Sequence, residues 1–233
     1  MIPWLRRPRD PFPPLDRALK EPNGLLAAGG DLSPTRLLDA YRRGIFPWFS
    51  EGEPILWWSP DPRMVLIPAE LKVSRSLAKV LRNREYEVRA DTAFREVMEA
   101  CAAPRRGQRG TWITDEMMDA YCRMHALGYA HSVETWIGSE LVGGLYGMAL
   151  GRAFFGESMF SRASDASKIA LVHLVRRLER KGFGIIDCQM NTPLLASFGA
   201  RELPREDFTN RLKELVNYPA IPGHWRMEDG AAE

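Results

Sequence analysis

HSVETWIGSELVGGLYGMALGRAFFGESMFS, residues 131–161, is the stretch that decides the fold. It holds three runs rich in β-forming residues, 131–137, 141–149 and 153–159, separated by short turns at Gly138-Ser139 and at Gly151. Short turns between such runs are typical of antiparallel hairpins. The stretch therefore predicts a three-stranded antiparallel meander.

Helical and β patterns alternate on either side of this meander. Capping residues and apolar periodicity predict helices over about 74–83, 91–102, 114–127, 165–181 and 204–217, with Ser74, Asp91 and Thr114 as N-caps. Further strands are predicted at 64–68, 86–89 and 184–189, and the last of them is expected to run parallel to its neighbour. The order resembles the acyltransferase fold of N-acetyltransferases. It predicts the α+β class, with a mixed, mainly antiparallel sheet flanked by helices.

Residues 1–62 predict a small, loop-rich N-terminal domain ahead of an acetyltransferase-like catalytic domain at 63–233. They are rich in Pro, Gly and Trp, and 11–32 reads mostly as loop. Ser33-Pro34 predicts the start of one helix, which Gly44 ends. Two aromatic clusters follow, at 45–49 and 55–58.

The composition is that of an ordinary soluble globular protein. Of 233 residues, 45% are hydrophobic and 27% charged, and the net charge is +2. No apolar run approaches the ~18 residues that cross a bilayer, and no apolar signal core follows the basic start. The three cysteines, Cys101, Cys122 and Cys188, are isolated, and the four histidines lack metal-ligand spacing. We expect a cytoplasmic protein with no disulfide framework, no metal and no membrane partner.

Residues 71–84 carry five positive charges and no acidic residue. Arg75, Lys79 and Arg82 fall at i, i+4 and i+7, on one face of the predicted helix, and Arg84 follows it. Such a stripe suits contacts with nucleic-acid phosphates. The alternative is a solvated basic helix face with no partner.

Two tryptophans lie in polar loops, where they are suited to stacking on a nucleobase. Trp48 follows a proline, and Trp112 comes after a basic loop that contains Arg105, Arg106 and Arg109. Base stacking on an aromatic ring contributes ~1–3 kcal/mol, and the basic loop is a second candidate for phosphate contacts. The alternative for each tryptophan is packing of its own loop.

Polar side chains end two of the predicted strands. Glu157 follows the run 153–156, and strand alternation places Asp187 and Gln189 on one face of 185–189. A carboxylate beside an amide at a strand end can hold an amine or polarise a carbonyl. The alternatives are an ordinary ion pair for Glu157 and a turn cap for Asp187.

Several blocks together resemble the leucyl/phenylalanyl-tRNA–protein transferases, the bacterial aminoacyltransferases of the N-degron pathway. The blocks are EPNGLLAAGGDLSP (21–34), YRRGIFPWFS (41–50), ILWWSPDPR (55–63), GTWIT (110–114), HSVETW (131–136), LVGGLYG (141–147), GESMFSRASDASKIAL (156–171), IDCQ (186–189) and LASFGAREL (195–203). The resemblance implies transfer of Leu, Phe or Met from its tRNA to a protein that begins with Arg or Lys, with no metal or nucleotide cofactor. The product would carry a degradation signal. We expect the enzyme to act as a monomer.

The resemblance also implies roles for single residues. Trp48 and Trp112 would flank the 3′-terminal adenosine of the tRNA. Asp187 would act on the acceptor amine through Gln189, either as a base or as an orienting group, and Glu157 would bind the acceptor's charge or the 3′ ribose. The residues expected to line the aminoacyl pocket are Met159, Phe154, Leu171, Leu174, Ile186, Leu145 and Ser161. Those expected to contact tRNA phosphates are Arg75, Lys79, Arg82 and Arg84.

Two other functions fit part of the pattern. An acyl-CoA N-acyltransferase needs a pyrophosphate-binding loop at a helix start. The nearest match, ERKGFG at 179–184, begins with Glu and follows a helix end, where the dipole repels phosphate. A non-catalytic tRNA-binding module would explain the basic stripe and the tryptophans, but it leaves the polar strand ends without a purpose.

Overall fold

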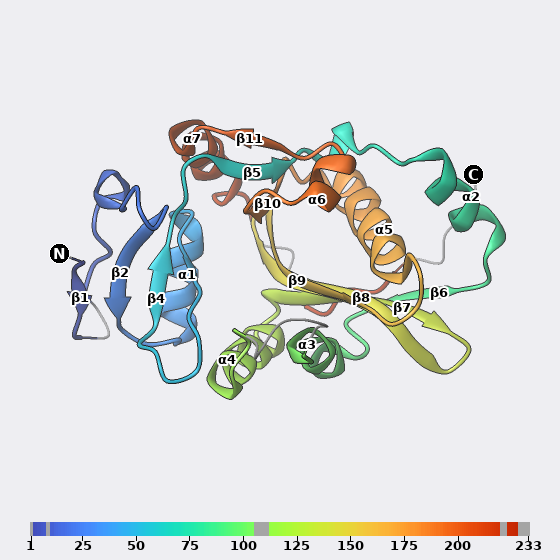
Figure 1. Ribbon diagram of the computed structural model, residues 1–233, viewed down its shortest axis with the longest axis horizontal. Coiled ribbons are helices and arrows are strands. Elements are labelled where there is room, and N and C mark those ends of the chain that lie inside the picture. Colours follow the sequence, from blue (N-terminus) through green and yellow to red (C-terminus); the bar gives the residue numbers. More distant parts are fainter. Residues whose placement is uncertain (1, 8–9, 105–111, 220–222, 228–233) are drawn as a thin grey trace.

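The computed structural model describes residues 2–7, 10–104, 112–219 and 223–227, which form two β-sheets with their helices (Figure 1). The strands are β1 (Trp4–Leu5), β2 (Leu25–Gly29), β3 (Phe46–Pro47), β4 (Leu56–Trp58), β5 (Arg63–Leu66), β6 (Glu87–Ala90), β7 (Ala130–Ile137), β8 (Glu140–Leu150), β9 (Ala153–Ser161), β10 (Ile185–Gln189) and β11 (Arg201–Leu203). The α-helices are α1 (Pro34–Arg42), α2 (Arg75–Asn83), α3 (Phe94–Ala102), α4 (Asp115–Ala126), α5 (Ala166–Arg180), α6 (Pro193–Ser197) and α7 (Arg205–Leu215).

The larger sheet confirms the predicted fold class. Its strand order is β11-β5-β10-β9-β8-β7-β6, and of its pairs only β9–β10 is parallel among the described residues. The predicted meander is β7-β8-β9, and the predicted parallel strand is β10. Helix α5 covers one face of this sheet and α3 and α4 cover the other (Figure 1). Close packing of α5 needs a glycine at 143, because a Cβ there would lie 2.5 Å from that of Ala166.

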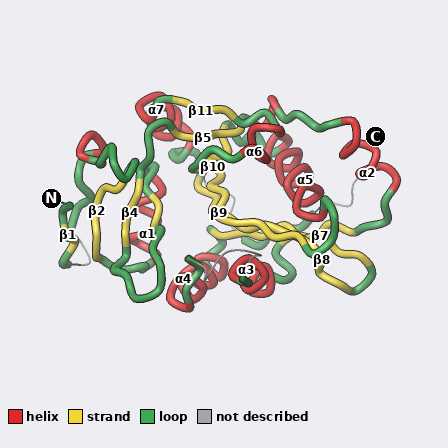
Figure 2. The backbone as a smooth tube through the Cα atoms, viewed as in Figure 1, coloured by secondary structure: helices red, strands yellow, loops and turns green. Residues whose placement is uncertain are grey.

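The smaller sheet has the order β1-β2-β4-β3 and lies at one end of the molecule, as Figure 2 shows. Strand β2 lies within 11–32, which the sequence predicted to be mostly loop. Every residue of β2 is buried, and the strand pairs with both β1 and β4. Glycines with positive φ lie just before the strand at 24, at its last residue 29 and just after it at 30, so the turn signals that suggested a loop belong to its ends.

One apolar core joins the two sheets. It contains Trp57 from β4, Tyr121 from α4 and Phe155 from β9, all fully buried. The predicted division between residues 62 and 63 falls between β4 and β5. The small sheet and α1 lie to one side of the larger sheet, where α1 contacts α4 (Figure 1). Among the described residues, no helix combines the length and the apolar composition that crossing a membrane requires.

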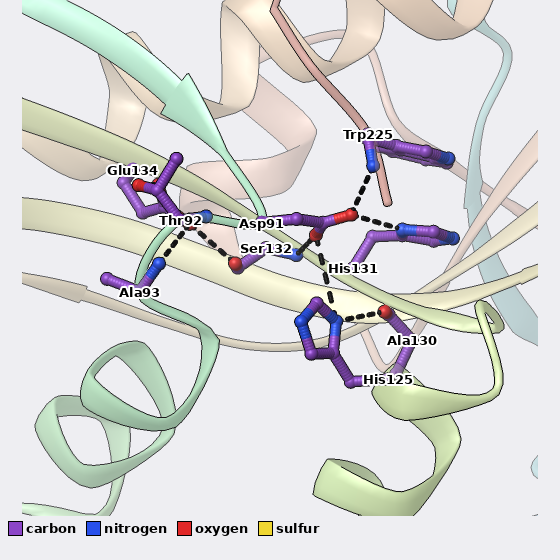
Figure 3. A network of polar contacts seen from close by, with 9 residues as sticks. All are labelled: Asp91, Thr92, Ala93, His125, Ala130, His131, Ser132, Glu134 and Trp225. Atoms are coloured by element: carbon purple, nitrogen blue, oxygen red, sulfur yellow. Dashed lines mark hydrogen bonds and ion pairs between the residues drawn. The ribbon is translucent and has the colours of Figure 1, made fainter. Parts of the chain in front are cut away.

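Three of the predicted N-caps are present, and one prediction is wrong. Ser33, Ser74 and Thr114 each accept a hydrogen bond from the backbone N–H three residues further on. Asp91 does not cap α3, which begins three residues later and has Ala93 at its N-cap position. No side chain of the described residues caps α3; the carboxylate of Glu134 from β7 instead accepts hydrogen bonds from the backbone N–H groups of residues 92 and 93, just before the helix (Figure 3).

The Asp91 carboxylate holds the C-terminal segment 223–227 against β7. One oxygen accepts hydrogen bonds from His131 Nδ1 at 2.8 Å and from the backbone N–H of Trp225 at 2.5 Å, and the other accepts one from Ser132 N–H at 2.8 Å (Figure 3). The buried Trp225 ring stacks on His131 with 3.9 Å between ring centres. Asp91 adopts a left-handed conformation, with φ of 57°, to reach these partners.

Candidate active site

A carboxylate network from four elements lies where the small sheet's helix meets the large sheet. Glu157 of β9 is half-buried. Its Oε1 accepts hydrogen bonds from the Tyr41 hydroxyl of α1 at 2.7 Å and from Gln189 Nε2 of β10 at 3.3 Å. Its Oε2 accepts one from the Tyr121 hydroxyl of α4 at 3.2 Å, and the two tyrosine hydroxyls also contact each other. Segments that are far apart in the sequence therefore meet on one carboxylate.

The surroundings of Glu157 raise its pKa to near neutral pH. Burial raises the pKa of Glu157 to about 7; the hydrogen bond from Tyr41 opposes the rise, the charge of Asp187 adds to it, and hydrogen bonds from Tyr121 and Gln189 oppose it. Burial likewise raises the pKa of both tyrosines well above the ordinary value, so they remain hydrogen-bond donors. A carboxyl group with a pKa near the working pH is suited to moving protons.

Asp187 lies behind this network, in a buried ion pair with Arg63 of β5. Arg63 Nε donates to Oδ1 at 2.8 Å and Nη2 donates to Oδ2 at 2.7 Å, and each side chain is only 1% exposed. Buried charges are stable only when paired and hydrogen-bonded in this way. Asp187 is thus within the electrostatic reach of Glu157, but its own oxygens are occupied by Arg63.

Gln189 is the one member of the network whose backbone conformation is strained. Its φ is 61°, which costs a residue other than glycine ~1–3 kcal/mol. Its backbone N–H donates to Asp187 Oδ1 at 2.9 Å, and the pairing of β10 with β5 is irregular between these two residues. The regular alternation predicted for 185–189 therefore ends at Asp187. The two side chains have different partners, Arg63 for Asp187 and Glu157 for Gln189.

The residues expected to line an aminoacyl pocket lie together, with one exception. Five of them are buried in a single apolar cluster between the meander, β10 and α5, and Met159 is partly buried against it. The five are Phe154, Leu171, Leu174, Ile186 and Leu145. Ser161 is exposed, and its hydroxyl donates to Ala163 O at 2.8 Å and accepts from Ser167 N–H at 3.1 Å. These contacts assign Ser161 to the start of α5 rather than to the apolar cluster.

The two tryptophans differ in their surroundings. Trp48 is 44% exposed, and its backbone is held by Trp58, whose Nε1 donates to Trp48 O at 2.7 Å. The two rings meet edge to face at 5.5 Å between centres. Trp112 is partly buried and packs against the core that joins the sheets. The predicted basic patch of Arg105, Arg106 and Arg109 lies outside the described residues.

The predicted basic stripe lies on α2, at the opposite end of the molecule from the small sheet (Figure 1). Arg75, Lys79, Arg82 and Arg84 are all exposed, while Leu77 faces the protein. We call these four residues the α2 basic stripe. Arg84 also donates a hydrogen bond to Ser164 O, which joins the end of α2 to the loop before α5.

Asp91, His125 and His224 form the single group of three potential metal ligands that the described part of the chain brings together, with ligand atoms within 4.8 Å of one another. His125 Nδ1 donates to Ala130 O at 2.8 Å, and the carboxylate of Asp91 already accepts three hydrogen bonds. Asp91 thus holds the C-terminal segment through Trp225, and the ring of His125 contacts that of His224 with 4.6 Å between ring centres.

Two residues of the network, Tyr41 and Tyr121, were not predicted from the sequence to be site residues, and neither was Arg63, the partner of Asp187. Periodicity separates a buried face from an exposed one, but it does not show that a buried hydroxyl or guanidinium meets a carboxylate from a distant strand. The only available signal was the position of Tyr41 and Arg63 inside blocks of the family resemblance.

Comparison with known proteins gives this arrangement a family. The family model described as leucyl/phenylalanyl-tRNA protein transferase matches residues 65–213, and the model of that family's N-terminal domain matches 30–61. Curated proteins named leucyl/phenylalanyl-tRNA–protein transferase are 69% identical in Nitrosospira multiformis, over all of both chains, and 68% identical in Nitrosomonas europaea, over 94% of this chain and 92% of the relative. The chain belongs to the leucyl/phenylalanyl-tRNA–protein transferase family.

As a leucyl/phenylalanyl-tRNA–protein transferase, the protein is an aminoacyltransferase whose substrate is aminoacyl-tRNA. The family, the enzyme class and this substrate, all predicted from the sequence, are confirmed. Among solved structures, a GCN5-related N-acetyltransferase from Kribbella flavida matches with a TM-score of 0.38 and 10% identity, over 72% of this chain and 60% of that one.

Proposed function

We propose that this transferase moves Leu, Phe or Met from tRNA to the N-terminal amine of proteins that begin with Arg or Lys. The new peptide bond would create an N-degron and mark the product for degradation. We infer that the enzyme acts in the cytoplasm and as a monomer. The observation that carries the proposal is the Glu157 carboxylate. It is held by two tyrosines and Gln189 next to a cluster of apolar side chains.

The reaction needs alignment and proton transfer rather than an activating cofactor. The acceptor amine nitrogen forms a bond to the carbonyl carbon of the ester, and the bond from that carbon to the ribose oxygen breaks. One proton leaves the amine and one reaches the departing ribose oxygen, so the step is balanced. Alignment of the two reactants alone contributes up to ~7–11 kcal/mol.

Glu157 is our candidate for converting the acceptor ammonium group into the neutral amine that attacks. Its pKa of about 7 lets it attract the ammonium group when ionised and then hold the proton that it removes. The second proton, which the nitrogen loses as the amide forms, goes to the departing ribose oxygen. Asp187 is the weaker candidate for this step because Arg63 occupies both of its oxygens. We therefore assign Asp187 the orienting role, through its bond to the backbone of Gln189.

The remaining predicted residues would hold the tRNA and the aminoacyl side chain. Trp48 offers an exposed ring for the terminal adenosine, with Trp112 as its proposed partner. The α2 basic stripe offers charge to the tRNA phosphates. Met159 would give the aminoacyl pocket a deformable wall that accepts unbranched and γ-branched side chains, whereas β-branched side chains are too stiff to adapt to it.

The test is a transfer assay with purified charged tRNA and short peptides. Leu-, Phe- and Met-tRNA are each offered to peptides that begin with Arg, Lys or Ala, with Val-tRNA as the donor control, and mass spectrometry identifies the product. We expect a mass increase of one aminoacyl residue on the Arg and Lys peptides only. Equal transfer to the Ala peptide would contradict the proposed acceptor, and equal transfer of Val would contradict the proposed pocket.

A further inference from the structure

Arg63 is a fully buried arginine at the start of β5, between the two sheets. Its guanidinium makes the two-point ion pair with Asp187 and lies between two aromatic rings. The ring of Phe46 from β3 is 4.9 Å from the guanidinium carbon, and the ring of Phe208 from α7 is 4.8 Å from it. Arg63 Nη1 has no hydrogen-bond partner among the described residues. Asp187 and the two rings therefore fix where this side chain lies.

Arg63 is connected to the carboxylate network through Asp187, whose Oδ1 atom it shares with Gln189. Asp187 Oδ1 accepts a hydrogen bond from Arg63 Nε at 2.8 Å and another from the backbone N–H of Gln189 at 2.9 Å. The second bond supports the left-handed conformation of Gln189, whose side chain then reaches Glu157. A strained residue keeps its conformation only where its surroundings determine it. Here the surroundings are a carboxylate that Arg63 holds at two points.

Arg63 is also connected to the proposed adenosine site, through its contact with the ring of Phe46. Phe46, which stacks on the guanidinium, lies two residues before Trp48 in the same extended segment. That segment pairs with β4, and the Trp58 indole of β4 holds Trp48 O. One buried cation thus contacts both the strand that carries the acceptor-side groups and the strand that carries the proposed nucleobase platform.

We propose that Arg63 is a positioning residue for aminoacyl transfer. Through Asp187 it keeps the amide of Gln189 on Glu157, and through Phe46 it fixes the segment that ends in Trp48. The assignment of substrates to these two sides rests on the function proposed above. The contacts of Arg63 with Asp187, Phe46 and Phe208 are independent of that proposed function.

The informative variant is Arg63→Lys, which keeps the positive charge but replaces the two-point fork with a single point charge. We expect kcat for transfer to fall at least tenfold, while KM for the acceptor peptide changes less than threefold. Arg177→Lys is the matched control, because Arg177 is also a buried arginine stacked on an aromatic ring, that of Trp225. We expect it to lower Tm to a similar degree and to leave kcat within threefold of the wild type.

A double-mutant cycle separates positioning from a general loss of stability. Arg63→Gln, Asp187→Asn and the double variant are compared, each with its Tm. If Arg63 acts through Asp187, Arg63→Gln lowers kcat less than threefold further once Asp187 is already Asn, and the double variant is more stable than Arg63→Gln alone. Effects that multiply in the double variant would overturn the proposal, as would a kcat of Arg63→Lys within threefold of the wild type.

A substrate-free readout keeps this test separate from the proposed function. Hydrogen exchange is followed by mass spectrometry on the segment 185–192 in the free enzyme. We expect Arg63→Lys to speed exchange there at least tenfold, whereas Arg177→Lys leaves it unchanged. If the wild type failed to transfer to Arg peptides, the proposed function would be wrong, and exchange in 185–192 would still decide the role of Arg63.

Discussion

Replacing Tyr41 with Phe removes one hydroxyl from the carboxylate network and should shift the pH dependence of transfer in a defined direction. The hydroxyl donates to Glu157 Oε1 at 2.7 Å, the shortest of the three hydrogen bonds that Glu157 accepts from the described residues. Because a donated hydrogen bond stabilises the ionised carboxylate, its loss raises the pKa of Glu157 from the wild-type value of about 7. Phe fills the same space, so the packing of the ring against Phe155 is kept.

The size of the shift follows from the strength of the bond that is lost. A hydrogen bond to a charged group contributes ~1.5–3 kcal/mol, and one pKa unit corresponds to about 1.4 kcal/mol. The pKa of Glu157 should therefore rise by about one to two units. At pH 7 the ionised fraction would fall from about one half to about 1–10%. Transfer at pH 7 should fall in proportion and recover as the pH is raised.

The assay is kcat/KM for transfer of Leu from tRNA to an Arg peptide, measured between pH 6 and pH 9.5. In this pH range the acceptor amine titrates and the aminoacyl ester hydrolyses. Both effects are the same for variant and wild type, so they cancel in the ratio of the two kcat/KM values, which is the quantity to plot. We expect the ratio to rise with pH. Tyr121→Phe, which removes the longer bond at 3.2 Å, should shift the curve less. A ratio independent of pH, or one that falls as the pH rises, would refute the role given to Glu157.

Three further predictions concern the Glu157 carboxyl, the packing of α5 on Gly143 and the α2 basic stripe. Glu157→Gln should abolish transfer and raise the stability of the protein at pH 8 by about 1–3 kcal/mol. The pKa of this carboxyl is raised on folding, so it favours the folded state below its unfolded pKa of ~4.3 and loses that contribution as the pH rises through about 7. Thermal unfolding of variant and wild type at pH 4.5 and pH 8 checks this. A larger gain in stability of the variant at pH 4.5 than at pH 8 would contradict it. Gly143→Ala should destabilise by about 1–3 kcal/mol, since its Cβ would lie 2.5 Å from that of Ala166, whereas Gly156→Ala, whose nearest contact is at 3.6 Å, should cost less than about 1 kcal/mol; urea unfolding measures both, and equal costs would show that α5 adjusts. Neutralising three residues of the α2 basic stripe should weaken tRNA binding and reduce the slope of log affinity against log salt by about 2–3, with kcat unchanged; an unaltered slope in a filter-binding titration would remove the stripe from the tRNA site.

The parts of the fold that sequence reasoning predicted are those that depend on neighbouring residues. The meander follows from alternation and glycine turns, and the helix starts at Ser33, Ser74 and Thr114 follow from side chains that bond three residues ahead. Asp91 has the same chemistry, but its carboxylate is bonded to His131, Ser132 and Trp225, and α3 begins three residues later without a side-chain cap from the part of the chain that the structure describes. A capping residue that has partners far away in the sequence does not act as the local pattern predicts.

The site shows the same division. Glu157 and Gln189 were predicted to be polar groups at strand ends, and the structure brings them together. Gln189 does end β10, but Glu157 lies inside β9, at the irregularity in its pairing with β8, so its predicted strand-end position is wrong. Asp187 has the same appearance in the sequence, yet it is removed from solvent by an arginine 124 residues away along the chain. Alternation along β10 gives no sign of this pair, because the ladder is irregular at that point and the partner arrives from β5.

The placement of Trp225 has a consequence for how the protein is made. Its backbone is bonded to a residue 134 positions earlier, and its ring fills the space next to His131, Phe154 and Phe183. Ribosomes release the chain from its N-terminus at ~5–20 residues per second. The space beside His131, Phe154 and Phe183 therefore stays open until residue 225 has left the ribosome. During that interval apolar side chains next to the sheet are exposed, and transiently exposed apolar surface of this kind makes an incompletely folded chain prone to aggregation.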